Sequence, residues 1–146
     1  MSHPAAPTVG LAVAHHFWKS TGSVDRTAVV AAVAEAVERG DQVVTAATLG
    51  HRCDLATMTL SSDQWNLRRL QTALCAAGLE LADSYISLTE ISEYAQGVPE
   101  EMRNNRLYPV LPPEGKPIFC VYPMSKRRDP DANWFTEDYE SRKDMM

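Results

Sequence analysis

A phenol, a thioether and three consecutive cations lie close together in the C-terminal part of this sequence. In FCVYPMSKRR, residues 119–128, Tyr122 is followed by Met124 and then by the run KRR, which begins at Lys126. A tyrosine phenol can act as an acid, a base or a redox centre. Ammonium and guanidinium groups bind carboxylates and phosphates through charge-assisted hydrogen bonds. The stretch therefore predicts a site for an anionic ligand.

A second pairing of arginine and tyrosine precedes this stretch. Arg106 and Tyr108 lie in the proline-rich region before it. Cations beside aromatic rings suit a flat, anionic ligand, because the guanidinium forks bind its carboxylates while the rings lie along its faces. We interpret the two groups as a site for a polycarboxylate or a phosphate. The alternative is that KRR is a solvated charge run with no ligand.

The remaining polar groups favour no metal site. His15 and His16 are adjacent in an apolar run, and neighbouring residues of a strand point to opposite faces, so the two imidazoles are not expected to share one ion. Glu100 and Glu101 are likewise neighbours and do not converge on one substrate as a catalytic pair does. No spacing among the four histidines matches a zinc site.

Composition indicates a soluble protein of the cytoplasm. The 146 residues include 45% hydrophobic residues, enough for a real core, and the formal net charge of −5 argues against a nucleic-acid partner. The three cysteines are far apart, which disfavours a disulfide framework and fits a reducing compartment. No apolar run is long enough to span a membrane.

Apolar patterning predicts four strands and two helices ahead of the candidate site. The expected strands cover 9–18, 42–49, 53–60 and 80–92. One helix is expected between the first two strands, capped by Ser23 with Asp25 in its first turn, with Val30, Val33 and Val37 as its apolar stripe and Gly40 at its end. The other is expected between the last two, capped by Ser62, with Leu67, Leu70 and Leu74 as its stripe and Gly78 at its end.

This order, βαββαβ, predicts an α+β protein of the ferredoxin-like class, with an antiparallel sheet and both helices on one face. The class belongs to the dimeric α/β-barrel type of superfamily. We expect a disordered leader over 1–8, the ferredoxin-like domain over 9–93, and a proline-rich loop, a strand and the start of a helix over 94–146. IFCVY, residues 118–122, is the expected fifth strand, and 139–146 begins the last helix.

Three stretches resemble the chlorite dismutase family: DSYISLTEISEYAQGVPEEMRNNRLYP (83–109), LPPEGKPIFCVYPMSKRR (111–128) and NWF (133–135). The resemblance is strongest to the coproheme decarboxylase branch, the peroxide-dependent enzymes that complete haem b synthesis in many bacteria. It runs from about His51 to the C-terminal end, whereas the first forty residues fit only as fold.

The resemblance implies roles for four residues. Tyr122 corresponds to the tyrosine that oxidises the coproheme propionates, and Lys126 to the lysine beside it that contacts a propionate and assists proton transfer. Arg106 corresponds to a propionate-binding arginine and Met124 to a methionine of the pocket. The implied cofactor is haem or coproheme iron, with hydrogen peroxide as co-substrate, in two successive oxidative decarboxylations. Coproheme is a flat tetracarboxylate, which agrees with the ligand expected from the residues alone.

The sequence also departs from the family. Family members carry a second ferredoxin-like domain that holds the porphyrin, and their proximal histidine comes after the segment that aligns with YESRKDMM. No histidine of this sequence occupies that position, so the resemblance assigns no metal ligand here. Three interpretations remain open: a half-protein completed by a second polypeptide that carries the haem-binding domain, a haem-free ferredoxin-like module that binds or oligomerises, and an inactive fragment. In the first two a homo- or hetero-oligomer is expected.

Overall fold

The computed structural model describes residues 5–95 and 97–145. Contacts divide the chain into two compact units, one that ends at Gly115 and one that begins at Lys116. Each unit is described by itself. The expected division into a domain over 9–93 and an extension over 94–146 stays a prediction.

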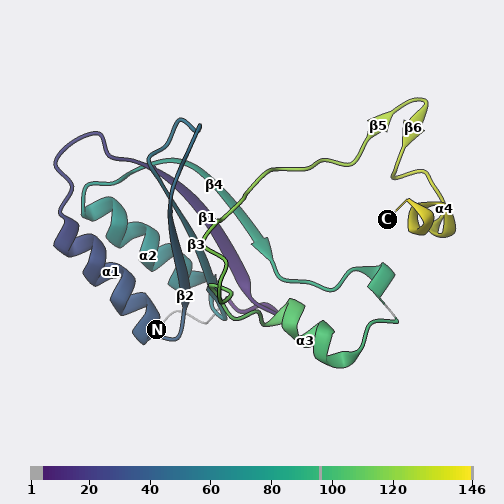
Figure 1. Cartoon of the computed structure of the whole chain (residues 1–146), viewed down its shortest axis with the longest axis horizontal. Helices are drawn as coiled ribbons and strands as arrows, with labels where there is room; N and C mark the ends of the chain where they lie inside the picture. Colours follow the sequence, from purple (N-terminus) through teal and green to yellow (C-terminus); the bar gives the residue numbers. More distant parts are fainter. Residues whose placement is uncertain (1–4, 96, 146) are drawn as a thin grey trace. The chain divides into compact units, whose positions relative to one another are not determined.

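The first unit is built from four strands and two long helices in the order that the sequence predicts (Figure 1). These elements are β1 (Ala12–Lys19), α1 (Arg26–Glu38), β2 (Gln42–Ala47), β3 (Leu55–Ser61), α2 (Gln64–Ala76) and β4 (Glu80–Leu88). The sheet order is β2-β3-β1-β4, and every neighbouring pair is antiparallel. Both helices cover the same face of the sheet (Figure 1). The ferredoxin-like fold expected from the sequence is therefore confirmed.

The strand register decides which side chains meet the helices. Trp18 is opposite Leu55, and His16 is opposite Thr57, so these four side chains share one face. Phe17, which lies between His16 and Trp18 in β1, points to the other face of the sheet. Side chains along β3 therefore alternate between the two faces of the sheet.

The main core lies between the sheet and the two helices. Trp18 is fully buried there and packs with two alanines of α1, two leucines of α2 and one residue after it: Ala32, Ala36, Leu70, Leu74 and Leu79. The indole Nε1 donates a hydrogen bond of 3.0 Å to Thr57 Oγ1, so this polar atom is satisfied inside the core. Small residues on α1 leave the space that the large indole fills.

The apolar stripe expected on α1 is wrong for Val30 and Val37, whereas its third member, Val33, is half-buried. The buried residues of α1 are Ala32 and Ala36, whereas Val30 is 68% exposed and Val37 is 54% exposed. Hydrophobicity favoured the valines, but the bulk of Trp18 selects alanines for the buried side. The stripe of α2 is confirmed, since Leu67, Leu70 and Leu74 are its buried residues.

Both N-caps differ from those expected. Asp25, not Ser23, caps α1 by accepting a hydrogen bond of 3.0 Å from Ala28 N. Asp63, not Ser62, caps α2 by accepting one of 3.0 Å from Trp65 N. In each case a carboxylate lies close to the expected serine, and its negative charge is favoured at the positive end of the helix.

The two helices end as expected. Gly40 and Gly78 follow α1 and α2 with φ of 95° and 96°, a conformation that glycine adopts without strain. At Gly78 an added Cβ would lie 2.7 Å from Ser23 O, so a side chain there would also collide with the segment that leads into α1.

The rest of the first unit carries a short helix that is tied to the sheet. After the 3-10 turn Glu93–Ala95 comes α3 (Glu100–Leu107), a helix within the region that the sequence predicted as a proline-rich loop. Thr89 Oγ1 donates to Leu107 O at 2.7 Å, and Gly10 N donates to the Tyr108 hydroxyl at 3.2 Å. The end of α3 is therefore fixed both to the residue after β4 and to the segment before β1.

The segment after α3 is also anchored. The Gln42 amide donates to Pro109 O at 2.8 Å, and its oxygen accepts from Leu111 N at 2.7 Å. One side chain at the start of β2 thus holds a stretch that belongs to no helix or strand.

The second unit contains less regular structure than expected. IFCVY is not a strand, because residues 116–127 form neither helix nor strand. A small hairpin follows, made of β5 (Arg128–Asp129) and β6 (Ala132–Asn133). The expected C-terminal helix is confirmed as α4 (Tyr139–Asp144), capped by Asp138. The strand prediction failed because an apolar run needs a partner edge, and none of the described residues pairs with this one.

The leader is partly described. Residues 1–4, with His3, lie outside the described residues, whereas Ala5 N donates to Asp63 Oδ1 at 3.1 Å and Ala5 O accepts from Gln64 N at 3.1 Å. The disordered leader expected over 1–8 stays a prediction. Among the described helices, none combines the length and apolarity needed to cross a membrane.

The corrected core gives a test by paired substitutions. Leu74 is fully buried, so Leu74→Ala should lower the free energy of unfolding by about 2–5 kcal/mol through lost burial and the cavity left behind. Val30 belonged to the expected stripe but is exposed, so Val30→Ala should change it by less than about 0.5 kcal/mol. Urea unfolding followed by circular dichroism measures both. Equal losses for the two variants would contradict the packing described.

Candidate functional site

The three consecutive cations of the second unit each have a partner. Lys126 Nζ lies 4.0 Å from the centroid of the Trp134 ring. The guanidinium of Arg128 lies 4.3 Å from the centroid of the Phe135 ring. Arg127 Nε pairs with Asp129 at 2.6 Å. All three cations thus take part in local contacts while remaining exposed, and the choice between a ligand site and a solvated charge run stays open.

The β5–β6 hairpin brings these partners together. It reverses the chain after Asp129, so that Trp134 and Phe135 return to the cations that precede the turn. Trp134 N donates to Arg127 O at 3.0 Å, which fixes the return strand beside the cations. This contact was not predicted from the residue types. The turn-forming run DPDA between KRR and NWF was the signal that could have revealed it.

Tyr122 and Met124 are both open to solvent. Tyr122 is 67% exposed and Met124 is 83% exposed. Among the described residues the Tyr122 hydroxyl has no hydrogen-bond partner. The phenol is thus available to an incoming ligand, and the cation four residues further on, Lys126, is already held on an aromatic ring.

Arg106 lies in the last turn of α3, and its side chain is exposed. Tyr108, two residues later, accepts a hydrogen bond from Gly10 N at its hydroxyl. Arg106 belongs to the unit that ends at Gly115, whereas Tyr122, Met124 and Lys126 belong to the unit that begins at Lys116. That Arg106 joins the other three in one site therefore stays a prediction.

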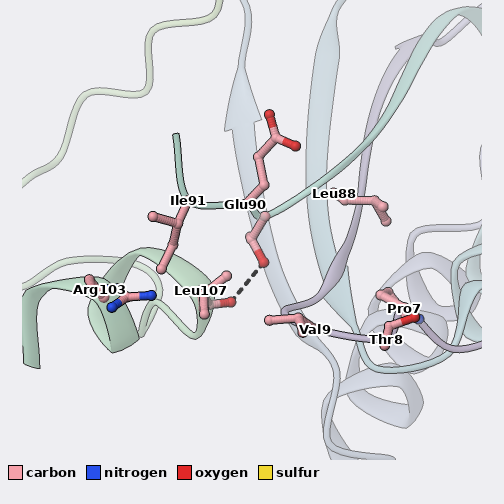
Figure 2. A pocket seen from close by; sticks show the side chains of 9 residues that line it. Pro7, Thr8, Val9, Leu88, Glu90, Ile91, Arg103 and Leu107 are labelled. Carbon is pink, nitrogen blue, oxygen red and sulfur yellow. Dashed lines mark hydrogen bonds between the residues drawn. The ribbon is translucent and has the colours of Figure 1, made fainter. Parts of the chain in front are cut away.

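A cavity of about 400 Å³ opens beside α3 in the first unit (Figure 2). It is lined by the N-terminal arm, the end of β4 and α3: Pro7, Thr8, Val9, Leu88, Thr89, Glu90, Ile91, Arg103 and Leu107. Figure 2 shows the Arg103 side chain extending towards Leu107, while the Glu90 carboxylate points away from Leu107. Arg103 was not among the expected site residues. Its position three residues before Arg106, one helical turn away, was the available signal.

The two adjacent histidines of β1 point to opposite faces, as expected. His16 is 2% exposed on the helix side, where its ring lies 5.4 Å from that of Trp18. His15 is half-buried on the other side. Burial, reinforced by the neighbouring His15, lowers the pKa of His16 to about 4. Burial also lowers the pKa of His15.

A neutral His16 fits its surroundings. Its Nδ1 is buried and has no hydrogen-bond partner within the described part of the chain, so a charge there would be unsolvated. Among the described residues, no three of the types His, Cys, Asp and Glu come together in a way that could hold a metal ion.

The chemistry of two described groups fits the acidic arms of a porphyrin. Lys126, whose ammonium group lies on the Trp134 ring, can bind a carboxylate, and the exposed phenol of Tyr122 can reach a ligand bound there. That these residues form one porphyrin site stays a prediction.

The sheet order, the crossovers and the two helices on one face define a ferredoxin-like α+β protein. A sequence profile of the chlorite dismutase family matches residues 26–146. The chain belongs to the chlorite dismutase family.

Two solved structures share the fold. A haem-binding protein from Thermus thermophilus superposes with a TM-score of 0.70 at 21% sequence identity, over 100% of this chain and 68% of that one. A mutant of the chlorite dismutase from Candidatus Nitrospira defluvii superposes with a TM-score of 0.54 at 15% identity, over 96% of this chain and 63% of that one. This chain therefore spans about two thirds of the length of each.

The low pKa of His16 predicts a pH dependence of stability. The unfolded chain takes up a proton near pH 6.5, but the folded chain does so only near pH 4. The free energy of unfolding is therefore highest above pH 6.5 and falls as the pH drops towards 4. The loss through His16 should be about 2 kcal/mol between pH 7.5 and pH 5.

The comparison of wild type with His16→Phe isolates this effect, because other groups titrate in both proteins. Urea unfolding at pH 7.5 and at pH 5 gives the unfolding free energy of both proteins. The value for wild type minus the value for the variant should be about 2 kcal/mol lower at pH 5 than at pH 7.5. The same difference at both pH values would show that His16 is not held neutral by burial.

Proposed function

We propose that this chain forms the carboxylate-binding and oxidising side of a haem-binding enzyme, whose substrate is coproheme. The observation that carries the proposal is the placement of Lys126 on the Trp134 ring, four residues after an exposed phenol. Family membership and the haem-binding protein of similar fold support the haem component.

The chain's own residues suit the acidic arms of such a ligand. Lys126 offers a compact cation whose ammonium group is positioned by the Trp134 ring, so less freedom is lost when a carboxylate binds. Arg106 offers a planar fork for a second carboxylate and sits in the last turn of α3. Met124 supplies an exposed apolar side chain between Tyr122 and Lys126 for the porphyrin face.

Binding of the ligand would also order residues 122–126, which carry Tyr122, Met124 and Lys126. Residues 122, 124 and 126 are spaced by two, so an extended conformation would turn all three side chains to one face. The segment forms neither helix nor strand in the second unit. A flat ligand, or the protein that presents it, would supply the surface along which it extends.

The proposed reaction removes two carboxyl groups from the ligand. Each propionate, with one hydrogen peroxide and one proton, becomes a vinyl group, carbon dioxide and two molecules of water. The iron porphyrin supplies the activation of peroxide when it is bound. Tyr122 would give up an electron and a proton at its hydroxyl oxygen and recover both from the propionate side chain, so that the phenol is restored. The second electron would leave the ligand as carbon dioxide is released, while Lys126 would hold the reacting carboxylate and assist the proton transfer.

The iron-binding side is proposed to come from a second polypeptide or from further chain. The two solved structures are longer than this chain, which accounts for 68% and 63% of them. We place the activity in the cytoplasm, because the three cysteines are free.

A haem-free binding or assembly module is the second candidate. It is favoured by the exposed apolar side chains of β4, which carry no obvious role in porphyrin binding. An inactive fragment would show neither ligand binding nor specific assembly.

Titration with ferric coproheme, followed at the Soret band, tests the proposal with and without the iron-binding partner of the same family. Lys126→Gln and Arg106→Gln should each weaken binding by about tenfold, as expected for one lost charge-assisted hydrogen bond. Tyr122→Phe should bind within about twofold of wild type, because its phenol acts on the bound ligand.

Arg68→Gln is the matched control, since Arg68 is an exposed arginine of α2 outside the candidate site. If Arg68→Gln weakened binding as much as Lys126→Gln does, net charge alone would explain the binding. That result would contradict the proposed site. Absence of coproheme binding in every combination would favour the haem-free module.

A further inference from the structure

Strand β4 presents an exposed edge and exposed faces along its second half. It is an edge strand, with β1 as its neighbour in the sheet (Figure 1). All five residues from Ser84 to Leu88 are exposed. Tyr85 is 46% exposed, Ile86 is 60% exposed and Leu88 is 50% exposed. Apolar side chains thus lie at solvent on both faces of this strand.

The usual protections of a sheet edge are missing here. The stretch SYISL, residues 84–88, contains no charged residue and no proline. The irregularity in the pairing of β4 with β1 lies between Phe17 and Trp18, at the other end of the strand. An uncharged, regular edge with outward backbone groups is a template on which another strand can add.

We infer that this edge pairs with β4 of a second copy of the chain, antiparallel and about a two-fold axis at Ile86. Such pairing is isologous, so one uncharged surface satisfies both partners. It would join the two sheets into one, with the backbone groups of both edges hydrogen-bonded to each other.

Charge disfavours one of the two neighbouring registers, the one centred on Tyr85. With Ile86 opposite Ile86 of the second copy, Asp83 faces Thr89 and Glu80 faces Ser92 of that copy, so no acidic residues oppose each other. A shift that centres the axis on Tyr85 would instead place Glu80 opposite Glu90. Asp83 is in addition paired with Arg52 at 2.7 Å, which reduces its repulsion of another copy.

The exposed apolar residues fit the same arrangement. Ile86 and Leu88 lie on the helix side of β4, because they are opposite Ala14 and Ala12, whose side chains face the helices. In the inferred pairing the two Ile86 side chains meet, and each Leu88 lies diagonally beside the Ile86 of the other copy. Four apolar side chains would then cover one another.

Sedimentation velocity over a concentration series tests the interface without any porphyrin. Wild type should show a monomer–dimer equilibrium, and Ile86→Lys should raise the dissociation constant at least about tenfold, because two ammonium groups would face each other at the axis. The matched control is Leu49→Lys in the β2–β3 loop, where the side chain is 98% exposed. It should leave the equilibrium unchanged.

Cysteine cross-linking tests the register. In a background with the exposed Cys75 and Cys120 changed to serine, Ile86→Cys should form a disulfide-linked dimer on mild oxidation. Tyr85→Cys should not, because its copies would be diagonal neighbours about 7–8 Å apart.

A wild type that stays monomeric over the series, or a dimer that Ile86→Lys and Leu49→Lys affect equally, would overturn the inference. So would a cross-link at Tyr85→Cys that equals the one at Ile86→Cys.

Discussion

The first unit depends on the burial of one tryptophan. Trp18 lies between the sheet and both long helices, fully removed from solvent, with its only polar side-chain atom bonded to Thr57. Its bulk fixes how far α1 stands from β1 and explains why alanines face the core there. It also shares its surroundings with His16, which is held neutral by the same burial.

A different kind of aromatic contact organises the second unit. The rings of Trp134 and Phe135 contact cations of the preceding run KRR. The β5–β6 hairpin brings the two rings beside these cations. Cation–aromatic contacts of this kind hold a charge in place while leaving it open to an anion. The exposed phenol of Tyr122 lies four residues away along the chain, which places a reactive group and a positioned cation within one short segment.

The fold could be predicted from the sequence because its signals are local. Alternation in β3, the leucine stripe of α2 and the two helix-ending glycines each act over a few residues, and all agree with the structure. The errors arose where a distant side chain decided the outcome. The stripe of α1 depends on Trp18, which no spacing within the helix reveals, and IFCVY lacks the neighbouring strand that its composition would need.

The candidate site was predictable as chemistry and less so as geometry. Residue types alone indicated a polycarboxylate or a phosphate beside a phenol, and that ligand stays a prediction. The contact of Lys126 with Trp134 depends on the turn between them, which the run DPDA signals but residue types alone do not. The role of Arg106 depends on an approach between two units and remains a prediction.

The most direct measurement of the central claim is the mass of the porphyrin after ferric coproheme and hydrogen peroxide are added to the chain together with its iron-binding partner. The account predicts successive losses of carbon dioxide and hydrogen from two propionates with wild type, and unchanged coproheme mass with Tyr122→Phe. Equal conversion by wild type and Tyr122→Phe would contradict the role assigned to the phenol.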